Sequence, residues 1–125
     1  MCKVAVEAAE ELEKVGISVE VIDVQTLIPF DRYDRILGSL RKTNRIAFLD
    51  EDVPGGATAY MMREVLERME GYPLLDSAPV TITGAEHRPA YGSDGDYFSK
   101  PSVETIFDRL YGMMHESAPE RFPMI

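Results

Sequence analysis

The sequence has few of the features that would suit an oxidising compartment or a membrane. It contains one cysteine, Cys2, and no tryptophan. A single cysteine excludes an internal disulfide and a cysteine-based zinc site, and it suits a reducing cytosol. No apolar run approaches the roughly 20 residues of a membrane helix. The first residues also lack the apolar block of a secretory signal, so we expect a cytoplasmic protein that does not bind membranes.

Positive charge is also scarce. The sequence contains 13 lysines and arginines and 22 aspartates and glutamates, which gives a net charge of −9. Such a surface repels phosphate backbones and anionic lipid headgroups. We therefore expect no nucleic-acid partner.

The 125 residues suffice for one domain in which strands and helices alternate. Apolar periodicity and capping residues predict helices over 3–15, from Asp31 through Leu40, after Gly56, and from Ser102. Dense apolar runs predict buried strands at 18–24, 46–49 and 78–83. Alternation of this kind is typical of a three-layer α/β/α fold with a mostly parallel sheet. We expect the domain to cover 1–115, followed by an extended tail over 116–125.

The order of the elements has one unusual feature, because the chain opens on a helix that runs directly into a strand. This is the order of a sheet that lacks the strand before its first helix. A sheet with such a gap leaves unpaired backbone edges, which attract another strand. We therefore expect the isolated chain to self-associate.

Polar and glycine residues gather after two of the predicted strands, where ligands of open α/β sheets bind. Candidate contact residues follow the second and third strands: Asp50, Glu51, Gly55, Gly56, Glu86, His87, Arg88 and Tyr91.

Several of these candidates also have a simpler interpretation, which the sequence favours. Asp50 and Glu51 could bind magnesium, but neighbours along a strand seldom point the same way, so a solvated acidic turn is the better interpretation. Gly55-Gly56 lacks the spacing of a phosphate-binding loop and is typical of a tight turn. His87 could act as a general acid or base, yet a surface position is favoured. We assign no catalytic, cofactor-binding or metal-binding residue.

Four blocks of the sequence resemble a known family. They are EVIDVQTLIPFD at 20–31, KTNRIAFLDED at 42–52, GGATAYMMREVLE at 55–67 and APVTITGAEHRPAY at 78–91. In this order they resemble the transketolase C-terminal domain family, in particular the C-terminal domain of the beta subunit of thiamine-diphosphate-dependent 2-oxo acid dehydrogenase components.

The resemblance implies a parent enzyme that decarboxylates a 2-oxo acid and passes the acyl group to a lipoyl carrier. It implies that thiamine diphosphate and magnesium are bound elsewhere in that enzyme. The partners it implies are a homo-oligomer or an alpha/beta assembly, and a lipoyl-bearing acyltransferase core. Two other hypotheses remain: the same domain of a transketolase or deoxyxylulose-phosphate synthase, and a free-standing α/β module that binds a partner.

Overall fold

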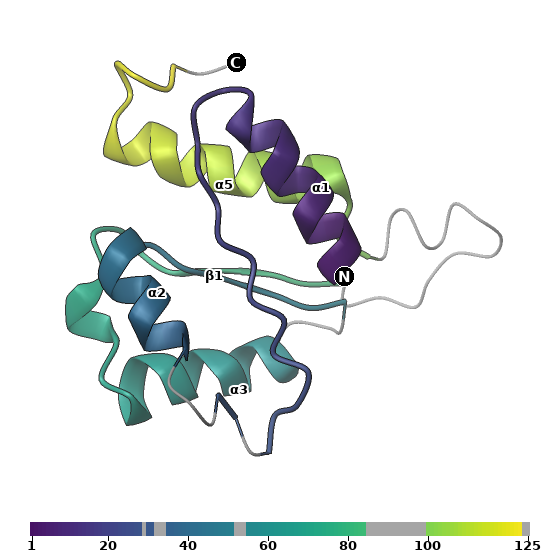
Figure 1. Ribbon diagram of the computed structural model, residues 1–125, viewed down its shortest axis with the longest axis vertical. Helices are drawn as coiled ribbons and strands as arrows, with labels where there is room; N and C mark the ends of the chain where they lie inside the picture. Colours follow the sequence, from purple (N-terminus) through teal and green to yellow (C-terminus); the bar gives the residue numbers. More distant parts are fainter. Residues whose placement is uncertain (29, 32–34, 52–54, 85–99, 124–125) are drawn as a thin grey trace, which may run out of the picture.

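The computed structural model describes residues 1–28, 30–31, 35–51, 55–84 and 100–123. Two short parallel strands lie between two groups of helices (Figure 1). In chain order the elements are α1 (Cys2–Glu13), α2 (Arg35–Thr43), β1 (Ala47–Leu49), α3 (Ala57–Arg63), η1 (Glu64–Arg68), η2 (Tyr72–Leu74), β2 (Val80–Ile82) and α5 (Val103–Ser117). Helices α1 and α5 cover one face of the strands, and α2 and α3 cover the other. The predicted α/β/α architecture with a parallel sheet is confirmed.

The sheet is built by the parallel pairing of β1 with β2. Ala47 pairs with Val80, Phe48 with Thr81 and Leu49 with Ile82. Because side chains alternate along a strand, Phe48 points to the face opposite that of Leu49 and Ile82. Each face therefore receives its own set of apolar side chains.

The face that carries Phe48 packs against α2 and α3. Phe48 shares one buried cluster with residues of these helices, of η1 and of the segment before α2, namely Phe30, Ile36, Leu40, Met61 and Val65. The ring of Phe30 also makes an edge-to-face contact with Tyr60, with the centroids 6.3 Å apart. This cluster anchors the segment that leads into α2.

The opposite face packs against α1 and α5. Ile82 is buried with Ala8 of α1 and Ile106 of α5, and Leu49 packs against them. A third cluster extends this layer, in which Leu12, Ile17 and Phe122 are buried together. The two terminal helices therefore form one layer, although they lie at opposite ends of the sequence.

Two helix caps predicted from the sequence are confirmed. The carboxylate of Asp31 accepts hydrogen bonds from the backbone N–H groups of Arg35 and Ile36, both at 2.9 Å. The hydroxyl of Ser102 accepts from the backbone N–H of Thr105 at 3.2 Å. Each bond satisfies a donor that the first turn of a helix leaves without an intrahelical partner.

The strand predicted for 18–24 is not formed. Ile17 is buried, but the rest of this apolar run crosses the molecule without strand pairing, and Val21 and Ile22 are 37% and 39% exposed. The physical reason is that a strand requires a partner, and β1 and β2 pair only with each other among the described residues. The prediction of a buried strand at 18–24 is therefore wrong, although the segment is apolar as the sequence indicates.

The chain after α5 differs in detail from an extended tail. Helix α5 continues to Ser117, and the following residues turn back, with the N–H of Phe122 bonded to the carbonyl of Ala118 at 2.9 Å. The hydroxyl of Tyr111 donates to the carbonyl of Pro123 at 2.7 Å. Phe122 is consequently buried on the layer formed by α1 and α5.

Gly71 follows η1 at a point where the backbone leaves no room for a side chain. A Cβ there would lie 2.8 Å from the carbonyl oxygen of Val65 and 3.2 Å from Cδ2 of Leu40. We predict that Gly71→Ala destabilises the chain by about 1–3 kcal/mol, because backbone and core must shift to accept the methyl group. The free energy of urea unfolding measures the effect.

Gly112→Ala is the matched control. Gly112 lies within α5, and apart from its chain neighbours and the backbone of its own helix no described atom lies within 4 Å of a Cβ at that position. Alanine is a better helix former than glycine by about 0.5–1 kcal/mol, so the control is expected to raise stability. Equal effects of the two substitutions would show that crowding at Gly71 is not the cause.

Candidate functional site

The candidate residues at the end of β1 are engaged in local structure. The backbone N–H of Asp50 donates to the carbonyl of Ile82 at 3.1 Å and extends the pairing with β2. Its carboxylate accepts from the N–H of Glu51 at 2.9 Å. Glu51 is exposed and lies 3.7 Å from the ammonium of Lys100. These contacts describe a strand end stabilised by its own side chains.

The two glycines before α3 also have structural roles. Gly55 has a φ of +88°, which glycine adopts without strain. The carbonyl of Gly56 accepts from the N–H groups of Ala59 and Tyr60 and so starts the helix. Within the described ranges, no group of three or more histidine, cysteine, aspartate or glutamate side chains could hold a metal ion.

The remaining candidates, Glu86, His87, Arg88 and Tyr91, lie outside the described residues. The other histidine of the sequence, His115, lies in the last turn of α5. Its Nδ1 lies 2.8 Å from the carbonyl oxygen of Phe122, which accepts a hydrogen bond from it. His115 thus helps hold the residues after α5 against the domain.

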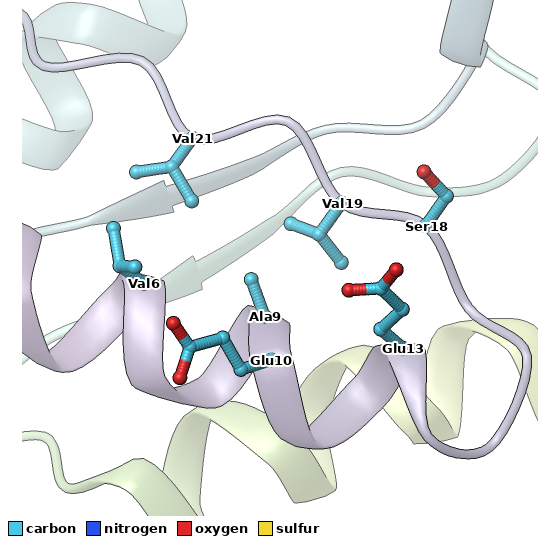
Figure 2. A pocket seen from close by; sticks show the side chains of 7 residues that line it. All are labelled: Val6, Ala9, Glu10, Glu13, Ser18, Val19 and Val21. Atoms are coloured by element: carbon cyan, nitrogen blue, oxygen red, sulfur yellow. The ribbon is translucent and has the colours of Figure 1, made fainter.

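One hollow in the described part of the chain lies where no site was predicted. It is a groove of about 310 Å³ between α1 and the segment 18–21. We call it the α1 groove, and its lining residues are Val6, Ala9, Glu10, Glu13, Ser18, Val19 and Val21. Figure 2 shows Val19 and Val21 directed toward α1, with the carboxylates of Glu10 and Glu13 at the helix surface. The sequence pattern did not predict the groove, because it assigned 18–24 to a covered strand.

The lining of the α1 groove is apolar and negative. Three valines and an alanine supply apolar surface, and two glutamates supply the charge. Among the described residues, no lysine, arginine or histidine lines it, and no helix N-terminus points into it. A diphosphate requires positive charge or converging N–H donors. The groove therefore does not fit thiamine diphosphate.

The segment beside the groove is held in place by side chains on its other edge. Glu20 accepts hydrogen bonds from the ammonium of Lys42 and from the hydroxyl of Ser39 on α2. These two contacts, the one to Lys42 first, lower the pKa of the Glu20 carboxyl. At the start of α1, partial burial and a hydrogen bond to Asp23 raise the pKa of the Cys2 thiol. A raised pKa disfavours the thiolate, so Cys2 is not set up as a nucleophile.

No helix among the described residues is long and apolar enough to cross a membrane. The structure instead defines a small layered α/β domain with helices on both faces of a parallel sheet.

Comparison with known proteins identifies the family. The family model for the transketolase C-terminal domain matches residues 1–101, so the chain belongs to this family.

The curated relatives that match the chain are longer proteins. It is 38% identical over 116 residues to the mitochondrial pyruvate dehydrogenase E1 component subunit beta of Pisum sativum, covering 92% of this chain and 32% of that protein. It is 38% identical over 103 residues to subunit beta-1 of Oryza sativa subsp. japonica, covering 82% and 27%. It is 40% identical over 85 residues to the acetoin:2,6-dichlorophenolindophenol oxidoreductase subunit beta of Bacillus subtilis, covering 68% and 24%. The chain thus spans about a third or less of the length of these relatives.

The contact between Glu20 and α2 generates a prediction about pH. Because the pKa of Glu20 is lowered in the folded state, its contribution to stability is present above the unfolded pKa and is lost as the pH falls through the folded value. We predict that Glu20→Gln lowers the urea midpoint at pH 7. The difference from the unsubstituted chain is expected to shrink as the pH falls below the ordinary glutamate pKa of about 4.3 and to be lost once the pH passes through the lower folded pKa. Added salt is also expected to reduce the effect of Glu20→Gln on the urea midpoint at pH 7, because the ion pair between Glu20 and Lys42 is exposed.

Glu120→Gln removes a carboxylate from an exposed position after α5 and is the control for loss of one negative charge. Its urea midpoint is expected to match that of the unsubstituted chain. A Glu20→Gln effect that does not change between acid and neutral pH would contradict the assignment of the ion pair.

Proposed function

We propose that this chain is the C-terminal, non-catalytic domain of a thiamine-diphosphate-dependent 2-oxo acid dehydrogenase component. The parent enzyme carries out oxidative decarboxylation of a 2-oxo acid and transfers the acyl group to a lipoyl carrier. The observation that carries the proposal is the similarity to pyruvate dehydrogenase E1 beta subunits over up to 92% of the chain. The family match over 1–101 supports it.

The chemistry of the described residues supports a role outside catalysis. Asp50 and Gly56 are engaged in backbone contacts, and the α1 groove is lined by carboxylates. The groove does not present the cations or N–H donors that a diphosphate needs. In the proposal, thiamine diphosphate and magnesium are therefore held by the rest of the parent enzyme.

The substrate is proposed as a 2-oxo acid because the relatives from Pisum and Oryza are named pyruvate dehydrogenase components. The Bacillus relative, named an acetoin oxidoreductase subunit, favours acetoin as a second candidate. Turnover of acetoin in preference to pyruvate by the assembled enzyme would select the second candidate.

The role proposed for the domain is assembly, with docking of the acyltransferase core as a further part of it. Ile28 supports this role, because it is 83% exposed and is the most exposed of the large apolar side chains described. An apolar side chain in such a position is characteristic of a contact that another subunit covers. We propose that Ile28 contacts the alpha subunit of the parent enzyme.

A co-purification experiment tests the proposed assembly role. The tagged chain is co-expressed with the alpha subunit of a pyruvate dehydrogenase E1 component, and the alpha subunit recovered with the tag is quantified. We predict that Ile28→Asp reduces the recovery by roughly tenfold, the effect of losing about 1.4 kcal/mol at an interface. Ile28→Leu, which keeps the apolar surface, is expected to retain it.

Failure of the unsubstituted chain to recover the alpha subunit would contradict the assembly role and favour a free-standing module. Recovery that is equal for Ile28→Asp and Ile28→Leu would show that Ile28 is not the contact. Circular dichroism of both variants checks that each is folded.

A further inference from the structure

We propose that Tyr60 is a positioning residue for the subunit contact at Ile28. The ring of Tyr60, held by Glu64, fixes Phe30. The anchored Phe30 in turn fixes the direction in which Ile28 projects. This inference rests on the proposed function, because Ile28 is the residue proposed to contact the alpha subunit. It adds to that interface a residue that acts through the contact residue.

The position of Ile28 is set by neighbouring side chains rather than by regular secondary structure. Ile28 is 83% exposed, whereas Phe30, two positions later, is 6% exposed. Side chains two positions apart share a face in a regular strand, so the backbone here has another form. The buried ring of Phe30 therefore ties this part of the chain to the domain.

Two residues with a left-handed backbone lie before and after Ile28. Gln25 has a φ of +62°, and Asp31 has a φ of +42°. Residues that carry a side chain rarely adopt such angles, which persist where surrounding contacts enforce them and which cluster at functional sites. Beside Gln25, the N–H of Thr26 donates to the carbonyl of Val24 at 2.6 Å. The carboxylate of Asp31 caps α2. The backbone on both sides of Ile28 is thus constrained.

Apolar contacts anchor the chain on both sides of Ile28. The rings of Phe30 and Tyr60 meet edge to face, with their centroids 6.3 Å apart and their planes at 84°. Val24 and Leu27 pack against the cluster that contains Phe30. Ile28 therefore projects from a segment whose neighbouring side chains are fixed to the core.

The ring of Tyr60 is held in turn by a carboxylate. The hydroxyl of Tyr60 donates to Oε1 of Glu64 at 3.0 Å, and Nε of Arg68 donates to Oε2 at 2.7 Å. The Glu64 side chain is only 12% exposed, and a charge in such a position requires partners. The hydrogen bond from Arg68, and after it the one from Tyr60, lowers the pKa of the Glu64 carboxyl. Glu64 is therefore ionised at neutral pH and accepts from both donors.

The helix widens where Glu64 lies. Helix α3 ends at Arg63 and continues directly into η1, a π-helical turn in which the N–H of Met69 donates to the carbonyl of Glu64 at 2.9 Å. Such turns within helices are frequent at functional sites. The network of Tyr60, Glu64 and Arg68 is centred on this turn, which is a second indication of a role beyond packing.

A fluorescent reporter tests the effect on position 28 without any partner. The sequence contains no tryptophan, so Ile28→Trp places a single indole at the proposed contact. Time-resolved fluorescence anisotropy measures its local motion. We expect Tyr60→Phe to increase the amplitude of this motion, because the ring stays but loses its bond to Glu64. Glu64→Ala removes the acceptor of the same bond and is expected to have the same effect.

Tyr111→Phe is the matched control. It also removes a tyrosine hydroxyl that donates a hydrogen bond, in this case to the carbonyl of Pro123 at 2.7 Å. We expect it to leave the motion of the indole unchanged. Circular dichroism checks that every variant is folded.

Affinity for the alpha subunit of a pyruvate dehydrogenase E1 component tests the consequence for the interface. We expect Tyr60→Phe to raise the dissociation constant about fivefold, the effect of losing one hydrogen bond. Because Tyr60 acts through Ile28, the same substitution is expected to change the dissociation constant less than twofold when Ile28→Asp is already present. Tyr111→Phe is expected to have no effect in either background.

Unchanged motion of the indole in both Tyr60→Phe and Glu64→Ala would overturn the positioning role. An equal loss of affinity with and without Ile28→Asp would overturn it as well, because Tyr60 would then act independently of Ile28. Either result leaves the proposed function intact. Failure of the unsubstituted chain to bind the alpha subunit would instead contradict the proposed function, and with it the interface that Tyr60 is proposed to serve.

Discussion

The parallel pairing of β1 with β2 determines how every other element of the domain is placed. Three residue pairs fix which side chains reach each face, and this separates Phe48 from Leu49 and Ile82. Because both faces of the sheet are apolar, helices must pack against each of them. Helices α2 and α3 cover the first, and α1 and α5 cover the second (Figure 1). A change that shifted the register by one residue would exchange the side chains of one strand between these faces and disrupt both clusters.

The same pairing determines where functional groups can lie. At the end of β1, the backbone of Asp50 bonds to the sheet, and the carbonyl of Gly56 starts α3. The described residues include no group of three or more histidine, cysteine, aspartate or glutamate side chains that could hold a metal ion. The segment 18–23 runs beside α1 without joining the two-stranded sheet of the described residues. The parent enzyme is proposed to supply the cofactor, and this domain to supply surfaces for other chains.

Local signals in the sequence predicted most of the helices and their starts. Asp31 and Ser102 act as caps because capping depends on residues only a few positions apart. The segment 18–24 could not be predicted in this way, since a strand exists only if a partner is present. Its apolar content alone indicated burial. The α1 groove was missed for the same reason, because it exists only where that strand fails to form. The burial of Phe122 depends on tertiary contact with α1, which no local pattern encodes.

Membership of the transketolase C-terminal domain family and similarity to E1 beta subunits support the proposal that this domain contributes to a thiamine-diphosphate-dependent enzyme. We further propose that the domain does not bind the cofactor itself. Isothermal titration calorimetry of the chain with thiamine diphosphate and magnesium is the decisive experiment. We predict no saturable heat, because the α1 groove presents carboxylates to a diphosphate. Saturable binding with one site per chain would contradict the proposal.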